Sequence, residues 1–356
     1  MIMKICSMFL VALLSCSLCY GQSNYFKFGT VKFQDQSKAF TFPIFKHLSN
    51  NYSTEKINQL LQISELELLE GFEERNIFEK VSIDDGRIYG GKVDIDFRVQ
   101  TNNQKLLSIK FNQSSCGATC AYWVRYYNFN SGNGDLIQLK DLFTSKGYKS
   151  FVDFVTQRRI LQLKKEIKKL KPNSRDAFYD IIGSYETDKL FDYFIKGNEL
   201  FIDGENSFYK NQKFDGIETV CKFKLSEFKH LLNPFGKSLF FINKQSVKKY
   251  QSQTLPQLFQ GTIADKSILL VLNTDYDNKM RGVYVYSKYG KGIFLEGSFN
   301  GIELNLIEKL AKPRNTGFID YVDNGFIKAN FDGQKIKGTW ANKDKTQIYD
   351  LELIRK

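Results

Sequence analysis

Hydrophobic and polar residues in the first 240 positions follow two periods, one typical of strands and one typical of helices. Alternation predicts strands over 25–34, 38–45, 77–83, 87–99, 106–112, 121–129, 191–196, 199–203 and 218–223. Apolar residues spaced by three and four predict a helix with Ser53 as its N-cap, and another over 148–171 that Pro172 ends. Shorter helices are expected over 174–183 and 226–232. This order of elements predicts a mixed α+β domain with an antiparallel sheet.

The last hundred residues contain short alternating segments and no helical pattern. The predicted strands are 258–264, 267–273, 281–287, 292–298, 302–308, 316–321, 325–331, 335–341 and 346–354. Asn300-Gly301, Asn324-Gly325 and Asp332-Gly333 adopt positive φ at low cost, so we expect tight hairpin turns there. An all-β meander of eight or nine strands buries its edges by closing into a barrel or folding into a sandwich. We expect a small barrel.

A polar stretch separates the two predicted domains. Asn233-Pro234 and the polar residues that follow have the composition of an interdomain linker. The predicted division is a signal peptide over 1–21, an α+β extracytoplasmic domain over 22–240, a linker over 241–257 and a β-barrel-like domain over 258–356.

The first 21 residues have the pattern of a cleavable bacterial signal peptide. Lys4 supplies a positive charge, the apolar stretch 5–18 follows, and small residues before Gln22 favour cleavage at that point. Two alternatives stay open, namely lipidation at Cys16, which would tether the protein to a membrane, and retention of the segment as an anchor. We therefore predict an exported protein of the periplasm or cell surface, or a secreted one.

Composition and charge bear on the partners. Hydrophobic residues make up 42% of the chain, which is enough to bury real cores. The formal charge of +12 favours anionic surfaces or polymers, although a soluble and self-repelling surface accounts for the same charge. The predicted export argues against nucleic acid as a partner.

Three of the six cysteines lie beyond the predicted signal peptide, at Cys116, Cys120 and Cys221. Export permits disulfides. On one continuous strand Cys116 and Cys120 would lie about 13 Å apart, but across a tight hairpin loop they come within bridging distance. We predict a Cys116–Cys120 disulfide and a buried free thiol at Cys221. Pairing of Cys221 with one of the other two is the alternative.

Familiar catalytic motifs are missing from the sequence. The two histidines, His47 and His230, lie in different segments, and there is no His-Glu-x-x-His, no Gly-x-Ser-x-Gly, no phosphate loop and no dinucleotide fingerprint. The sequence therefore predicts no metal site, no cofactor and no particular catalytic residue. Paired carboxylates can cleave glycosides, and Asp and Glu are plentiful here, but nothing singles out a pair.

Four aromatic residues are candidates for ligand binding: Tyr122, Trp123, Tyr126 and Tyr127. On a strand Tyr122 and Tyr126 share one face, and Trp123 and Tyr127 share the other. One face is expected in the core. The other could stack on sugar rings, or it could pack against a neighbouring strand, which is the commoner use of such a face.

A second candidate surface is the basic side of the helix predicted over 148–171. Arg158, Arg159, Lys164 and Lys165 crowd the positions outside its apolar stripe. They could hold the phosphates of an anionic envelope polymer, or form an ordinary solvated face.

Structural motifs spread over residues 40–235 resemble a known bacterial domain. They are Phe42-Pro43, 55–61, 107–109, 126–129, 137–143, 193–195, 200–202 and 228–234. This stretch resembles an extracytoplasmic domain of unknown function that occurs in peptidoglycan deacetylases and in lysozyme-sensing anti-sigma factors. The end of the chain, with Gly338-Thr339-Trp340, resembles a small lipocalin-like β domain. The family has no established catalytic residues to carry over.

Two functions follow as hypotheses. The first is an exported non-enzymatic envelope protein that binds a protein or glycan partner. The resemblance implies peptidoglycan, another envelope glycan or a lysozyme-like protein as that partner. The second is a cell-wall glycan hydrolase, or a deacetylase-associated enzyme, that uses carboxylates. The scarcity of histidine and the absence of recognisable nucleophile motifs favour the first.

Overall fold

The structure is a computed structural model that describes residues 25–47, 49–82, 91–117, 119–172, 175–187, 191–208, 217–240, 247–248, 250, 255–274, 279–313 and 319–356. The predicted signal peptide over 1–21 lies outside these residues, as does much of the predicted linker over 241–257.

A five-stranded sheet in the order β1-β2-β3-β4-β5 forms the centre of the first domain. Its strands are β1 (Lys27–Gln34), β2 (Ala39–Lys46), β3 (Asp94–Asn102), β4 (Leu106–Cys116) and β5 (Cys120–Asn130). Neighbouring strands are antiparallel except β2 and β3, which are parallel. Helix α1 (Asn51–Leu66) lies in the crossover that a parallel pair requires. β5 is therefore an edge strand.

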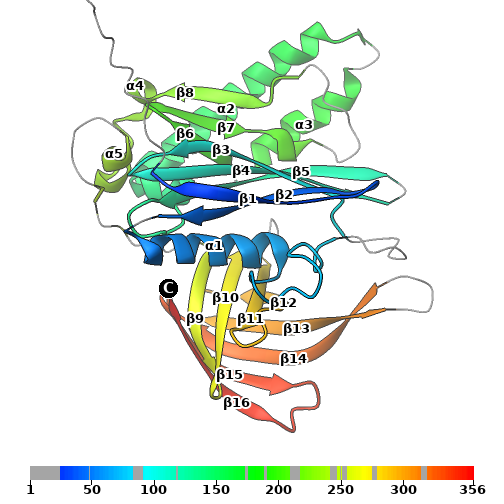
Figure 1. The fold of residues 1–356 in the computed structure, drawn as a ribbon. Coiled ribbons are helices and arrows are strands. Elements are labelled where there is room, and N and C mark those ends of the chain that lie inside the picture. The colour runs from blue at the N-terminus through cyan, green and yellow to red at the C-terminus, as the bar shows by residue number, and fades with distance from the viewer. Residues whose placement is uncertain are drawn as a thin grey trace, which may run out of the picture.

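A second layer covers one face of this sheet. It contains a three-stranded antiparallel sheet of β6 (Asp192–Lys196), β7 (Glu199–Asp203) and β8 (Val220–Lys224). The helices of this layer are η1 (Leu139–Leu142), α2 (Ser145–Lys169), α3 (Asp176–Thr187), η3 (Glu205–Ser207), α4 (Leu225–Phe228) and α5 (Pro234–Leu239). Figure 1 shows the order of the layers, from α2 and α3 through the two sheets to α1 and the second domain.

Eight antiparallel strands close into a barrel in the second domain. They are β9 (Gln257–Ile263), β10 (Lys266–Thr274), β11 (Met280–Tyr286), β12 (Gly292–Phe299), β13 (Glu303–Pro313), β14 (Ile319–Phe331), β15 (Lys335–Asn342) and β16 (Ile348–Arg355). β16 pairs with β9, so the barrel has no open edge. The predicted fold class is confirmed, and the all-β part is a barrel.

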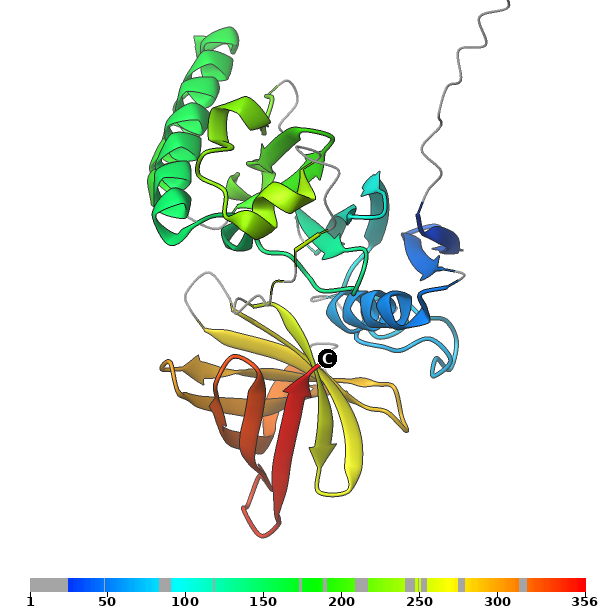
Figure 2. The same ribbon diagram turned by 90° about the vertical axis from the view of Figure 1, so that its left-hand side faces the viewer.

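The two domains share a hydrophobic interface along α1. In β10, Ile268, Leu270 and Leu272 point into the barrel core, whereas Leu269 and Val271 join the core of the first domain. This explains the unbroken apolar run of β10, because a strand buried on both faces does not alternate. Figure 2 shows the barrel below the layered domain, with the C-terminus beside α1.

Backbone hydrogen bonds add to this interface. The Leu69 N–H donates to the Gly290 carbonyl at 2.9 Å, and the Gly292 N–H donates to the Glu67 carbonyl at 2.7 Å. Gly290 has φ of +62°, and a Cβ there would lie 2.3 Å from the Phe72 ring. A larger residue at Gly290 would therefore strain the turn and push the domains apart.

Two predictions for the first domain were wrong in detail. Residues 77–81 form turns and Ser82 forms a single β-bridge with Lys92, and Ile77, Phe78 and Val81 reach the core from this loop and not from a strand. Asn50, and not Ser53, caps α1, since its side chain accepts the Ser53 N–H. The Ser53 hydroxyl instead donates to the Ser131 carbonyl.

Two predicted breaks lie inside or at the start of regular elements. Asn324-Gly325 is not a hairpin turn, because β14 continues through it as one strand opposite an irregularity at Glu308 and Lys309. The barrel therefore has eight strands and not nine. Asn233-Pro234 starts α5, with Asn233 as N-cap and proline in the first turn, where its missing N–H costs nothing.

Candidate functional site

A cleft of about 700 Å³ lies where β5 faces one end of the barrel. The first domain lines it with the strand residues 122–127, with 136–140, Tyr148, 191–193, Asn206 and Phe208. The barrel side contributes Leu255, Pro256, Asn273, Thr274, Phe299 and Phe331. The volume lies within the usual range of ligand-binding pockets, and the lining mixes aromatic and aliphatic groups with a few amide and charged ones. This interdomain cleft is our candidate site.

All four predicted aromatic residues line this cleft, but they differ in solvent exposure and in their contacts with other side chains. The Tyr122 side chain is 59% exposed, and Trp123 is half-buried. The Tyr126 ring stacks on Phe194 with centroids 5.6 Å apart, and its hydroxyl donates to Asp203. Tyr127 is buried. The first two rings are therefore the ones open to a ligand.

The free edge of β5 is already covered along most of its length. The Asn206 side chain accepts the Val124 N–H at 2.9 Å and donates to the Val124 carbonyl at 2.7 Å. Further along, the Asn128 carbonyl accepts the Ile137 N–H at 2.7 Å, and the Asn130 N–H donates to the Asp135 carbonyl at 2.8 Å. Such caps keep an edge strand from pairing with another chain.

A buried carboxylate lies behind the cleft wall. Glu65, on α1, is 0% exposed and accepts hydrogen bonds from Tyr127 and Gln113. It forms ion pairs with Lys92 at 3.0 Å and Arg125 at 3.3 Å. Burial alone would raise the pKa of Glu65, but the charges of Lys92 and Arg125 and the Tyr127 hydroxyl outweigh it and lower the pKa to about 2.

Sequence reasoning missed Glu65, although a signal was present. Ile57, Leu61 and Glu65 are spaced by four and lie on one helix face, and all three are fully buried. A charged residue continuing an apolar stripe indicates a buried, paired carboxylate. No comparable signal marks Asn206, because its role as an edge cap depends on how the second layer crosses β5.

The basic helix is not a uniform anion-binding face. Arg158 lies 2.6 Å from Glu227, and Arg159 is only 2% exposed, with its guanidinium 3.8 Å from the Tyr185 ring centroid. Lys164 and Lys165 are exposed on α2. The structure therefore divides this set into one buried arginine, one partly exposed and paired arginine, and two solvated lysines, and none of the four lines the cleft.

The cysteines are arranged as predicted. Cys116 and Cys120 lie at the facing ends of β4 and β5, with their sulfur atoms 2.02 Å apart in a disulfide. Cys221 is a buried free thiol that donates to the Gln162 side chain. Because the disulfide closes the turn two residues before Tyr122, it holds the start of the aromatic run.

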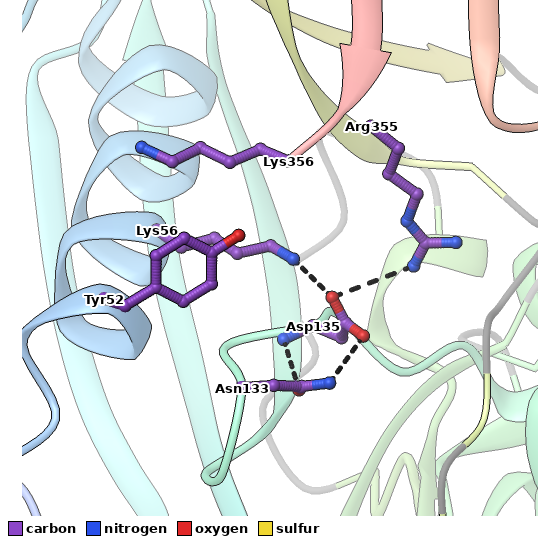
Figure 3. Close-up of a pocket in the computed structure, with 6 residues that line it drawn as sticks. All are labelled: Tyr52, Lys56, Asn133, Asp135, Arg355 and Lys356. Carbon is purple, nitrogen blue, oxygen red and sulfur yellow. Dashed lines mark hydrogen bonds and ion pairs between the residues drawn. The ribbon is translucent and has the colours of Figure 1, made fainter.

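A smaller pocket of about 240 Å³ lies at the same domain junction. It is lined by Tyr52, Lys56, Asn133, Asp135, Arg355 and Lys356. Figure 3 shows Lys56 and Arg355 pointing at the Asp135 carboxylate from opposite sides. Lys56 donates to Asp135, and Arg355 lies 4.0 Å from it. Because Lys56 comes from α1 and Arg355 from the end of the barrel, the Asp135 pocket connects the two domains.

A third polar group lies inside the barrel. Glu308 is buried and accepts hydrogen bonds from the Tyr284 hydroxyl at 2.7 Å, from the Trp340 indole at 2.8 Å and from the Asn324 amide. Asn324 reaches Glu308 from the irregular point of β14 that the sequence had suggested was a turn. These bonds satisfy Glu308 within the barrel wall.

Among the residues that the structure describes, no three His, Cys, Asp or Glu side chains are grouped to hold a metal ion. In the same part of the chain, no helix is both long and apolar enough to cross a bilayer.

Comparisons with known proteins give only distant likenesses. No protein-family model and no curated sequence matches the chain. A solved structure of a DUF3298 family member from Bacteroides fragilis is 15% identical, with a TM-score of 0.44, and the match covers 61% of this chain and 99% of that one. A solved structure of a DUF3298 family protein from Pseudomonas aeruginosa is 13% identical, with a TM-score of 0.36. That match covers 61% of this chain and 97% of the other. At these values the likeness does not say what the chain does.

Proposed function

We propose that this protein is an exported, non-enzymatic envelope protein that binds a glycan in the interdomain cleft. The observation that carries the proposal is the cleft itself, about 700 Å³ in volume and lined by the open rings of Tyr122 and Trp123. Gln138 and Asn273 add amide groups to the same lining. Aromatic faces that stack on the apolar side of a sugar ring, beside polar groups that bind hydroxyls, are the chemistry a saccharide requires.

The covered edge of β5 favours a glycan over an extended peptide. A peptide would bind an edge strand by adding a further strand through backbone hydrogen bonds. Asn206 already occupies both backbone groups of Val124, and the segment at Asp135 and Ile137 occupies those near Asn128. A peptide strand would have to displace these bonds, whereas a saccharide that stacks on side chains would not.

The lining also favours binding over hydrolysis. Most glycosidases place two carboxylates on either side of the scissile bond, about 5–10 Å apart. Among the lining residues the structure describes, Asp192 is the one carboxylate, and its side chain accepts a hydrogen bond from Asn206. The predicted export and the resemblance stated from the sequence make peptidoglycan or another envelope glycan the ligand we propose.

Calorimetric titration with soluble peptidoglycan oligosaccharides tests this function. We expect saturable binding that Tyr122→Ala and Trp123→Ala each weaken by roughly tenfold, the effect of losing one stacking contact. Tyr289→Ala is the matched control, because Tyr289 is also 59% exposed but lies outside the cleft. Binding of a lysozyme-like protein in place of the saccharides, or equal affinity in all three variants, would overturn the proposal.

A further inference from the structure

We propose that the ligand of the cleft is an acidic saccharide whose carboxylate binds Arg125. This inference rests on the proposed glycan function and specifies the ligand of the same site. In this role Arg125 binds the negative charge of the ligand, which the aromatic residues of the cleft wall would not do.

The Arg125 side chain is held by an ion pair on one side and is exposed to the cleft on the other. It lies on β5 between Trp123 and Tyr127, on the strand face that these two residues share. One nitrogen, Nη1, lies 3.3 Å from the buried Glu65 carboxylate, yet the side chain is 49% exposed and lines the cleft. A guanidinium carries five N–H groups in a rigid plane, so Glu65 holds part of it while the rest can bind a carboxylate.

The local charge is in surplus on the positive side. Glu65 faces both Lys92 and Arg125, so one negative charge is shared by two positive ones. Burial raises the pKa of the neighbouring Glu67. The charged side chains that line the cleft are Arg125, Lys140 and Asp192, two of them positive and one negative. An anionic group on the ligand would therefore meet a net positive site.

The spacing of the wall fits a sugar acid. Alternate residues on a strand point the same way and lie roughly 7 Å apart, which is about the width of a pyranose ring with its substituent. A sugar ring stacked on Trp123 can therefore place a carboxylate at Arg125. Planar guanidinium groups bind carboxylates through two parallel hydrogen bonds, which a lysine at the same place would not reproduce.

Other basic groups that the structure describes on α2 and in the smaller pocket lack this combination. Arg159 is buried against Tyr185, and Arg158 pairs with Glu227. Lys56 and Arg355 share Asp135 in the smaller pocket. Among the arginines that the structure describes, Arg125 is thus the one that both lines the cleft and has a half-exposed side chain.

Two pairs of matched saccharides test the inference on the full chain. One pair is the N-acetylglucosaminyl-N-acetylmuramic acid disaccharide and diacetylchitobiose, which differ by a lactyl carboxylate. The other is a galacturonic acid trisaccharide and its neutral galactose counterpart. We expect calorimetry to show that an acid binds more tightly than its neutral partner by roughly tenfold or more, and that added salt weakens the acid alone.

Variants separate the role of Arg125 from that of the cleft. Arg125→Gln should lower affinity for the acid by roughly ten- to a hundredfold and leave the neutral saccharide unchanged, with Arg125→Lys in between. Arg158→Gln, which also removes an arginine from an ion pair, should change neither. A circular dichroism melt of each variant confirms that it is folded.

The outcomes distinguish the two proposals. Equal binding of acid and neutral saccharides, insensitive to Arg125→Gln, would overturn the inference and leave the glycan function standing. Binding of none of the four saccharides would overturn both. Loss of neutral and acidic binding together in a folded Arg125→Gln variant would also overturn the inference, because it would make Arg125 a support of the cleft wall.

Discussion

The interdomain cleft and the Asp135 pocket lie at the same domain junction but use their charges differently. Neighbouring residues of the segment after β5 line both, with Asn133 and Asp135 in the pocket and 136–140 in the cleft. In the pocket, Lys56 and Arg355 converge on the Asp135 carboxylate, and both basic side chains are only 5% exposed. In the cleft, Arg125 is held from behind by Glu65 and stays half-exposed in front.

The difference distinguishes a structural contact from a ligand site. Lys56, Asp135 and Arg355 form the structural contact between the domains, which we call the latch. Basic side chains that are buried at a junction and directed at a shared carboxylate fix its geometry and present little surface to a ligand. A charge anchored on one side by a buried partner is oriented before a ligand arrives, which lowers the entropic cost of binding. We therefore attribute the stability of the domain arrangement to Asp135 and its partners, and ligand recognition to Arg125, Tyr122 and Trp123.

The largest effect is expected from removing the anchor behind the cleft. Glu65→Gln leaves Lys92 and Arg125 without their shared counter-charge, and breaking a buried ion pair in this way costs about 3–5 kcal/mol of unfolding free energy. Urea denaturation measures this loss. Glu227→Gln breaks the more exposed pair with Arg158 and should cost about 1 kcal/mol or less. Equal losses in the two variants would remove the distinction between an anchored and a surface charge.

Acid should reproduce part of that loss in the unchanged protein. The pKa of Glu65 is lowered from its usual 4.5 to about 2, so its contribution is fully present above pH 4.5. It is lost as the pH falls from 4.5 towards 2, because the unfolded chain then binds a proton that the folded chain does not. The contribution is about 3 kcal/mol. It is measured as the difference in urea stability between wild type and Glu65→Gln, which should shrink over that pH range. A constant difference would contradict the assignment.

Opening the disulfide should affect the cleft more than the latch. The bridge closes a short loop of about four residues between β4 and β5, so replacing both cysteines by serine should cost about 2 kcal/mol. Because Tyr122 follows Cys120 by two residues, saccharide affinity should fall as well. Thermal melts and calorimetry with and without reductant test both effects, and the double-serine variant should not respond to reductant. Unchanged affinity on reduction would show that the bridge does not support the cleft.

The smallest effect is expected at the latch. Asp135→Asn removes the carboxylate that Lys56 and Arg355 share, and since Asp135 is partly exposed the cost should be about 1 kcal/mol. Urea denaturation measures the cost, which should shrink with added salt. Affinity for the acidic saccharide should fall less than it does in Arg125→Gln. A larger fall would place the Asp135 pocket inside the binding site.

Local patterns predicted much of the fold. Alternation and glycine turns indicated the barrel, and helical spacing indicated α1 and α2. The failure at Asn324-Gly325 has a physical cause, because the dipeptide suits an irregular strand position as well as a turn. At that position the Asn324 amide bonds to Glu308, a contact between two strands that no local pattern records.

Only one wall of the candidate site, the one formed by β5, could be predicted from the sequence. Alternation on β5 correctly separates Tyr122 and Tyr126 from Trp123 and Tyr127, and all four line the cleft. The opposite wall, with Asn273, Phe299 and Phe331, depends on how α1 docks against the barrel, which leaves no local trace in the sequence. For the same reason the sequence could not distinguish the buried Arg159 and the paired Arg158 from the solvated Lys164 and Lys165.

Fluorescence of Trp123 tests the central claim, that the cleft binds a glycan, most directly. The chain has two tryptophans, and the other, Trp340, is hydrogen-bonded to Glu308 in the barrel. On titration with the N-acetylglucosaminyl-N-acetylmuramic acid disaccharide, the account predicts a saturable change in tryptophan emission that is absent in Trp123→Phe. The same change in Trp123→Phe, or no change in wild type up to millimolar saccharide, would contradict it.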